Sequence, residues 1–238
     1  MTNNLAATSA TTVTQGARYL RLPIVLMFLG ALSSFITTAW DAASRWSVFE
    51  GVVFGVAVVC GLAAFKIVTN PMKAAALIVF SPFAFYAAYF ASFVTQLMLS
   101  GLGLLSESEE ATMGHVASPS PIALFIGGLV GGFVLVGAVL WLVSEGNRHA
   151  RRALLWSVAS GILAVIGWAL SPLLGPALSH VIRILRPDEA WLTPQSGTPN
   201  GPLGMICSVF FVWQTSMAFA IGLMVQTKNQ VSNQEKPQ

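Results

Sequence analysis

The chain has 238 residues, of which 55% are hydrophobic and only 9% are charged. Soluble domains carry about 25% charged residues, so this composition excludes an ordinary soluble globular fold. The formal net charge is +3, but the basic residues stand at the ends of apolar runs and form no basic stripe with interleaved aromatic residues. We therefore expect no nucleic-acid partner. An integral membrane protein in contact with the lipid bilayer is the class that remains.

In chain order, the first element is an uncharged tail at 1–17, rich in Thr, Ser and Asn, for which we predict disorder. A transmembrane domain follows at 18–225, and a polar tail at 226–238 is again predicted to be disordered. The domain contains apolar runs at 22–40, 47–68, 74–99, 122–143, 153–174 and 205–225. A helix needs about 20 residues to cross the hydrocarbon core. The fold class is therefore predicted to be an all-α bundle of about six transmembrane helices.

The distribution of Lys and Arg predicts that both ends of the chain lie in the cytoplasm. In that orientation the outer segments hold only Arg45, Arg183 and Arg186. The inner segments hold Arg18, Arg21, Lys66, Lys73, Arg148, Arg151, Arg152, Lys228 and Lys236. The loops are short and contain no N-x-S/T sequon, so a bacterial inner membrane is the expected location.

The fifth run is expected to end at a break. Pro172 and Pro176 should stop or kink the helix, because proline lacks a backbone N–H and its ring clashes with the preceding turn. The segment that follows, at 177–185, is mostly apolar but contains His180 and Arg183. We predict that it lies flat on the outer membrane surface as a short helix.

Three glycine pairs have the GxxxG spacing that lets two transmembrane helices approach closely. They are Gly51 with Gly55, Gly127 with Gly131, and Gly128 with Gly132. Two interpretations remain open for these helix-packing residues. The glycines either pack helices within this chain or form a contact with another subunit.

Several polar side chains are predicted to lie inside the membrane, where an unpaired polar group is unfavourable. They are Gln214, Thr215, Ser33 and Ser34 near the middle of their runs, and Glu50 in the first turn of the second run. Interhelical hydrogen bonds are one explanation for them. A small polar pathway for a solute is the other, so these residues are the candidates for a ligand pathway.

The sequence gives no clear catalytic centre. Ala159-Ser160-Gly161 resembles the serine motif of the intramembrane rhomboid proteases, which implies a serine nucleophile at Ser160. That chemistry needs a histidine base, and no histidine lies within a later run. A cluster on the outer face contains Glu107, Glu109, Glu110, His115 and His180, but its spacing fits no metal motif. We predict no cofactor, no metal and no catalytic residues.

Three functions remain open. The first is a non-catalytic membrane component, a subunit or assembly factor that acts through helix contacts with other membrane subunits or as a homo-oligomer. The second is a transporter or channel for a small solute. The third is a membrane enzyme with a Glu/His site on its outer face.

Overall fold

The computed structural model of the chain is built from α-helices. It describes residues 21–44, 48–105, 120–143, 150–185 and 201–234, and this part of the chain contains no strand. The helices are α2 (Arg21–Ser44), α3 (Val48–Ala64), α4 (Pro71–Gly101), α6 (Pro121–Val143), α7 (Ala150–Ala169), α8 (Ser171–Leu185) and α9 (Gly201–Gln234). The prediction of an all-α fold is confirmed for the described residues. The predicted tail at 1–17 lies outside them.

Each predicted apolar run contains a helix, but not every helix is long enough to cross a membrane. Four stretches are long and apolar enough: Arg21–Ala39, Pro71–Gly101, Pro121–Trp141 and Cys207–Val225. A fifth arises only if the bent pair α7 and α8 is one span. The apolar part of α3, Phe49–Ala64, is shorter. At 1.5 Å per residue it extends about 24 Å, against about 30 Å for the hydrocarbon core.

The second run ends earlier than its composition predicts, because the backbone reverses at Lys66. This residue has a φ of 57°, in the left-handed region. The amide of Lys66 donates to the carbonyl of Ala63 over 2.8 Å, and the amide of Ile67 donates to that of Leu62 over 2.9 Å. These two bonds form a Schellman cap and satisfy the last carbonyls of α3. The side chain of Asn70 then caps the start of α4 by accepting from the amide of Met72.

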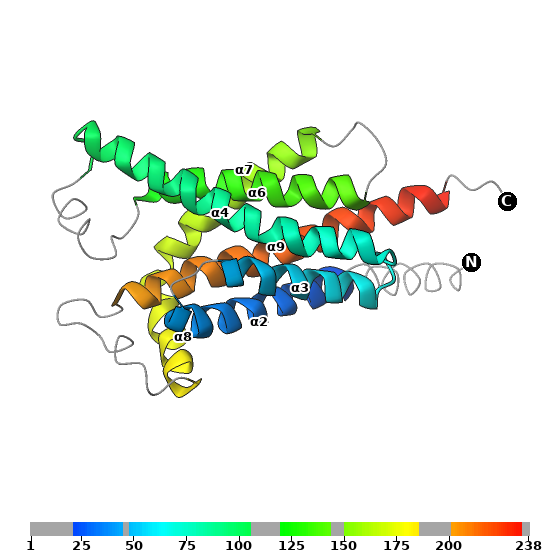
Figure 1. Cartoon of the computed structure of the whole chain (residues 1–238), viewed down its shortest axis with the longest axis horizontal. Helices are drawn as coiled ribbons and strands as arrows, with labels where there is room; N and C mark the ends of the chain where they lie inside the picture. The colour runs from blue at the N-terminus through cyan, green and yellow to red at the C-terminus, as the bar shows by residue number, and fades with distance from the viewer. Residues whose placement is uncertain (1–20, 45–47, 106–119, 144–149, 186–200, 235–238) are drawn as a thin grey trace, which may run out of the picture.

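The predicted break in the fifth run is confirmed. Helix α7 ends at Ala169, and α8 leaves it at an angle of 77°. Pro172 has no N–H to continue the ladder, and Pro176 lies inside α8. Figure 1 shows α8 turning away across one end of the bundle. Helix α8 begins at Ser171, six residues before the segment expected from the sequence.

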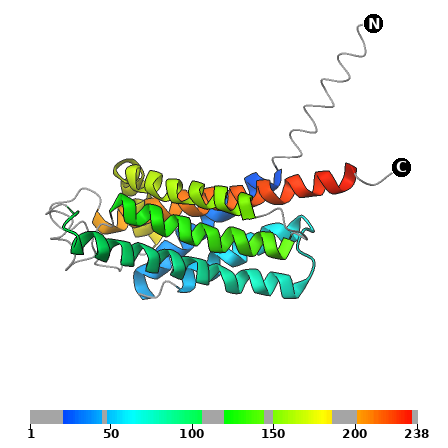
Figure 2. The same cartoon turned by 90° about the horizontal axis from the view of Figure 1, so that it is seen from above.

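The long helices form a closed ring, and α9 closes it. Each helix packs on the next in the order α2, α3, α4, α6, α7, α9, and α9 packs back on α2 (Figures 1 and 2). The centre of the ring is filled by aromatic side chains. Trp213 lies 5.0 Å from Phe85 and 6.1 Å from Phe54, measured between ring centroids. All three rings are buried.

The last helix extends further than expected. Helix α9 continues to Gln234, whereas the apolar run ends near Val225. The backbone of 226–234 is therefore helical where the sequence predicted a disordered tail. Gln and Lys are good helix formers, and the segment contains no proline or glycine, so the helix has no signal to stop at Val225.

The glycine pairs all lie at contacts between helices of this chain. A Cβ atom added to Gly51 would collide with Pro82 of α4, and one added to Gly55 would lie 2.9 Å from the Cβ of Ser81. The other two pairs use both sides of α6. Gly127 and Gly131 face Ala88 of α4, whereas Gly128 and Gly132 face Ser160 of α7. These glycine faces are occupied within the chain and are not free for another subunit.

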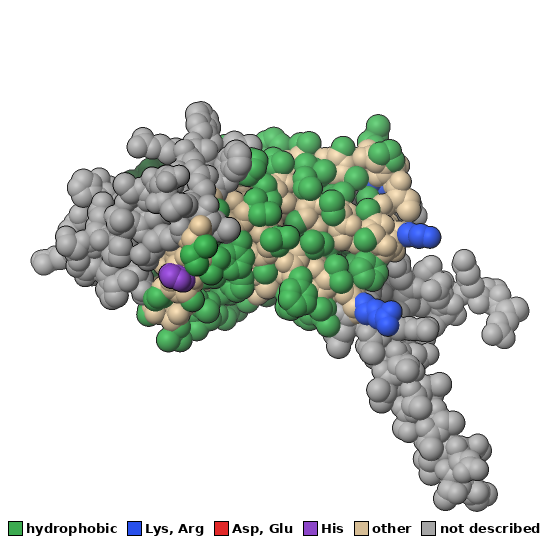
Figure 3. Space-filling view, turned by 90° about the horizontal axis from the view of Figure 1, so that it is seen from below, with side chains coloured by type: hydrophobic (Ala, Val, Ile, Leu, Met, Phe, Trp, Pro, Cys, Tyr) green, Lys and Arg blue, Asp and Glu red, His purple; other side chains and the backbone are tan. Residues whose placement is uncertain are grey.

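The outside of the bundle is apolar between its two ends. Figure 3 shows hydrophobic side chains over the described part of one face, with the basic side chains gathered at one end. Large apolar residues are exposed on every side of the ring, among them Phe28 of α2, Phe90 of α4 and Ile162 of α7. Such a surface is suited to lipid contact.

Candidate functional site

Two of the predicted pathway residues lie in direct contact. The hydroxyl of Ser33 in α2 is 2.6 Å from Oε1 of Gln214 in α9, and the two side chains are 1% and 0% exposed. A Cβ added to Gly30, the midpoint of the span Arg21–Ala39, would lie 2.6 Å from the carbonyl oxygen of Gln214. The Ser33–Gln214 pair therefore lies close to the middle depth of the bundle.

The hydrogen-bond pattern shows how one end of this amide is engaged, while its other end is buried without a hydrogen bond in the described part of the chain. The Ser33 hydroxyl also lies 2.8 Å from the carbonyl oxygen of Gly30, yet it has only one proton to donate. The amide of Gln214 has nearly the same shape when its oxygen and nitrogen are exchanged. With that exchange, Nε2 donates to Ser33 and Ser33 donates to Gly30. We therefore interpret the pair as a hydrogen-bonded tie between α9 and α2.

The neighbouring residue makes a second tie, from α9 to α7. Nε1 of Trp213 donates to Oγ of Ser160 in α7 over 2.7 Å, and Ser160 donates to the carbonyl of Gly128 in α6 over 2.7 Å. The proton of Ser160 is thus engaged in a structural chain that joins three helices. None of its hydrogen-bond partners here is a base, so the geometry does not support the nucleophile that the rhomboid-like motif implies.

The second predicted serine belongs to a polar strip along α2. The carbonyl of Ser34 accepts hydrogen bonds from the hydroxyls of Thr37 over 3.0 Å and Thr38 over 2.7 Å. Both threonines are buried. Bonds of this type, from a side chain back to the preceding turn, satisfy hydroxyl groups without a ligand.

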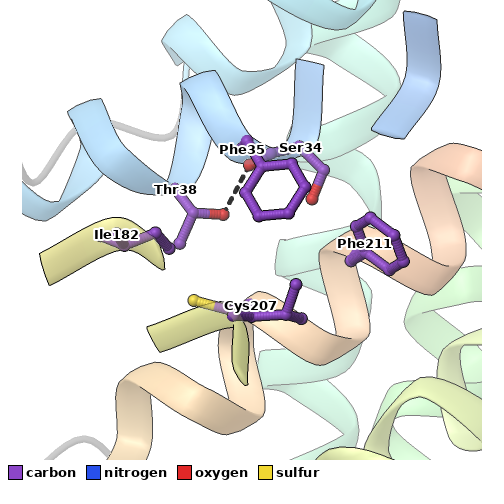
Figure 4. A pocket seen from close by; sticks show the side chains of 7 residues that line it. Ser34, Phe35, Thr38, Ile182, Cys207 and Phe211 are labelled. Atoms are coloured by element: carbon purple, nitrogen blue, oxygen red, sulfur yellow. Dashed lines mark hydrogen bonds between the residues drawn. The ribbon is translucent and has the colours of Figure 1, made fainter. Parts of the chain in front are cut away.

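A small hollow lies beside this strip, between α2, α8 and α9 (Figure 4). Its walls are Ser34, Phe35, Thr38, Leu178, Ile182, Cys207 and Phe211. The hollow and the open space at its mouth together measure about 140 Å³, and no part of it has room for a water molecule. The Cys207 thiol is free and buried. In this conformation the hollow holds no ligand-sized space.

The remaining predicted polar residues do not join the Ser33–Gln214 pair. Oγ1 of Thr215 is buried without a hydrogen bond in the described part of the chain, and so is Oγ of Ser81 beside Pro82. Glu50 lies in the first turn of α3, as predicted, but its side chain is only 3% exposed. The carboxylate is thus enclosed by neighbouring residues.

Most of the predicted outer Glu/His cluster lies outside the described residues. Glu107, Glu109, Glu110 and His115 lie outside the described residues, whereas His180 lies exposed on α8. No group of three His, Cys, Asp or Glu side chains that fits a metal ion occurs within the described ranges.

One exposed face of α4, which carries two tyrosines among apolar side chains, was not predicted from the sequence. Large side chains at Val79, Phe83, Tyr86, Phe90, Phe93 and Leu97 are all exposed, between 40% and 68%. They alternate at spacings of four and three residues, which places them along one side of the helix. We call these six residues the α4 seam. Tyr89, 66% exposed, lies beside it. Figure 2 shows α4 along the outer edge of the bundle.

The two tyrosines of this face lie near the middle depth of the bundle. Gly131 is the midpoint of the span Pro121–Trp141. A Cβ added there would lie 2.7 Å from the Cβ of Ala88 and 2.9 Å from the carbonyl oxygen of Ala84. Tyr86 lies between these two alanines, so it is level with the midpoint of α6. Tyr89 is one turn further along, about 4.5 Å away.

Neither tyrosine hydroxyl has a hydrogen-bond partner among the described residues. Helical side chains tilt towards the N-terminus of their helix, so the Tyr89 hydroxyl is directed back towards the middle of the bundle and the Tyr86 hydroxyl is directed from the middle towards the start of α4. Phenol groups in membranes usually lie at the headgroup level, where water satisfies them. Two exposed hydroxyls at this depth are therefore polar groups that lack a partner.

Comparison of the chain with protein families, with curated proteins and with solved structures found no match.

Proposed function

We propose that the protein is a non-catalytic component of a membrane assembly that binds another transmembrane helix through the outward face of α4. The observation that carries this proposal is the pair of unpartnered tyrosine hydroxyls, Tyr86 and Tyr89, on an exposed face at mid-depth. Lipid tails offer these groups no hydrogen bond, whereas a neighbouring helix does.

The magnitude of this effect favours a protein partner over lipid. An unsatisfied hydroxyl in an apolar environment costs about 1–3 kcal/mol. Tyr86 and Tyr89 together therefore contribute a penalty of about 2–6 kcal/mol when α4 faces lipid. A side chain from a second helix removes that penalty and also covers the aromatic rings of Phe83, Phe90 and Phe93.

The interior of the bundle supports the same proposal. The centre of the ring is filled by Phe54, Phe85 and Trp213, and the buried polar groups of Ser33, Ser160 and Gln214 are engaged in ties between helices. This arrangement is a packed scaffold whose helices are joined by hydrogen bonds. It supports a role in which the bundle presents a surface and does not open a path.

We further propose that the chain crosses a bacterial inner membrane six times with both ends in the cytoplasm. Arg21 begins α2, Lys66 follows α3 and Lys73 lies in the first turn of α4, so these three basic side chains share one end of the bundle. That end would be cytoplasmic by the positive-inside rule. Helix α3 then spans a locally thinned bilayer, and α8 lies on the outer surface.

Photocrosslinking from two matched positions tests the proposed docking face. Phe90 of α4 and Phe28 of α2 are 68% and 66% exposed, and each is replaced in turn by benzoyl-phenylalanine in native membranes. We expect a discrete protein adduct from position 90 and only lipid adducts from position 28. The proposal fails if position 90 also yields lipid alone.

A transporter or channel for a small solute is the second candidate, favoured by the contact between Ser33 and Gln214 at mid-depth. The polar strip through Ser34 and Thr38 leads from this pair towards one end of the bundle. If this function is correct, Gln214→Leu should abolish solute flux in reconstituted vesicles while leaving expression and thermal stability nearly unchanged. Equal flux in the variant and the parent would remove this candidate.

A further inference from the structure

The α4 seam has the pattern of a two-helix contact. Successive spacings of four, three, four, three and four residues, from Val79 to Leu97, repeat every seven residues. This is the period of a left-handed pair of helices whose seam residues interlock. None of the seam residues is buried by the chain itself. A second helix that packs along α4 would therefore cover a continuous row of side chains over about 27 Å.

The orientation of that second helix distinguishes the possible occupants. All copies of one chain enter the membrane in the same direction, so two α4 helices from two copies lie parallel. A parallel pair related by a twofold axis along the membrane normal brings each seam residue next to its own copy at the same depth. Tyr86 then lies beside the Tyr86 of the partner subunit.

The chemistry of tyrosine fits this symmetric arrangement. A phenol hydroxyl is both a donor and an acceptor, so one Tyr86 side chain can donate to the other across the axis. The flanking Tyr89 lies at the edge of the seam and reaches towards the same layer of the partner helix. Phe83 and Phe90, one turn to either side, pair with their own copies as edge-to-face or offset-stacked rings.

We infer that two copies of this chain associate through parallel α4 helices along the α4 seam, with Tyr86 hydrogen-bonded across the twofold axis. The inference rests on the proposed function, because it identifies the partner at the same face. A second copy supplies the required hydroxyl at the required depth from residues already present in the structure. Another protein would have to supply a matching polar group of its own.

Disulfide scanning in native membranes tests the inference. The background variant carries Cys60→Ala and Cys207→Ala, which removes the free cysteines of the chain. Single cysteines are then introduced as Phe83→Cys, Tyr86→Cys and Phe90→Cys on the seam. Phe28→Cys on α2 and Ile162→Cys on α7 are the controls, because they are exposed and lie on other helices.

We expect a covalent homodimer from the three seam positions under mild oxidation and none from the two controls. A second measurement avoids dependence on cysteine variants that fail to fold. Copies of the unmodified chain carrying donor and acceptor fluorophores at the C-terminus are mixed in lipid vesicles, and energy transfer above the level of random encounters is expected at a lipid-to-protein ratio of about 1,000.

Each outcome decides between the two proposals. Crosslinks at the seam alone support the second-copy contact, whereas equal crosslinks at the controls indicate random collision and overturn it. An absence of seam crosslinks and energy transfer also overturns it, although the proposed function survives if benzoyl-phenylalanine at position 90 captures a different membrane protein. Failure of all three measurements overturns both proposals.

Discussion

Polar side chains lie near the middle depth of the bundle both on the inner face of α9 and on the outer face of α4, but their hydrogen bonding differs. On α9, Trp213 and Gln214 contact different helices, α7 and α2, and each is hydrogen-bonded to a serine there. On α4, Tyr86 and Tyr89 are exposed and lack such partners. Trp213 and one end of the Gln214 amide thus find partners within the chain, whereas the two tyrosine hydroxyls are left to meet lipid or another protein.

Removing the central indole should have the largest effect on the α9 side of this comparison. Trp213→Ala deletes a ring packed against Phe54 and Phe85 and leaves Ser160 without its donor, so we expect a loss of about 3–5 kcal/mol in unfolding free energy. Trp141→Ala is the control, because Trp141 is 71% exposed, and it should change stability by less than about 1 kcal/mol. Denaturation in mixed micelles measures both. Equal losses would contradict an organising role for Trp213.

Helix α6 offers a matched pair of glycines for the next test. A Cβ added to Gly128 would lie 2.8 Å from the carbonyl oxygen of Ser160, whereas one added to Gly137 would meet nothing within 4 Å. Gly128→Ala should therefore lower the free energy of unfolding by about 1–3 kcal/mol. Gly137→Ala should leave it unchanged or raise it by about 0.5–1 kcal/mol. The pair is compared by thermal unfolding in one detergent, and a stable Gly128→Ala would show that α6 and α7 are not in close contact.

The tie between α2 and α9 predicts a coupling that a double-mutant cycle measures. Ser33→Ala leaves the amide of Gln214 without its hydrogen-bond partner, and Gln214→Leu removes that amide. The double variant should therefore be more stable than the sum of the two single losses in unfolding free energy predicts. We expect a coupling energy of about 1 kcal/mol, near the range for hydrogen bonds between transmembrane helices. Additive effects would mean that the two side chains do not interact.

The sequence revealed the helices better than their contacts. Long apolar runs predict helices because only a helix satisfies its own backbone in lipid, and Pro172 signalled the break before α8. The end of α3 was missed because the left-handed conformation of Lys66 is rare for a residue with a side chain. Ser33 and Gln214 were both identified as polar residues near mid-run. Their contact was not predictable, because no local pattern shows that the first and last spans are neighbours.

The tyrosines of α4 were overlooked for a different reason. In an apolar run Tyr counts as a hydrophobic residue, so composition alone does not distinguish it from Phe. The signal was nevertheless present in the sequence, as two phenol groups near the middle of a long run and large residues at alternating spacings of four and three. Only the packing of α4 against α6 shows that this face points outward.

The mildest change gives the sharpest test of the α4 side. Tyr86→Phe removes one oxygen atom and keeps the ring, so the unfolding free energy of the single chain should change by less than about 0.5 kcal/mol. If the hydroxyl bonds across the interface, the association constant of two copies in vesicles should fall by about three- to tenfold. Energy transfer between labelled copies measures the association, and Phe28→Leu on α2 is a matched change of an exposed aromatic residue that should not affect it. If a Tyr86→Phe variant associates as well as the parent, the apolar seam holds the two copies together without the Tyr86 hydroxyl. Association at α4 would then depend on ring packing, and the unpartnered tyrosine hydroxyls would no longer indicate a partner.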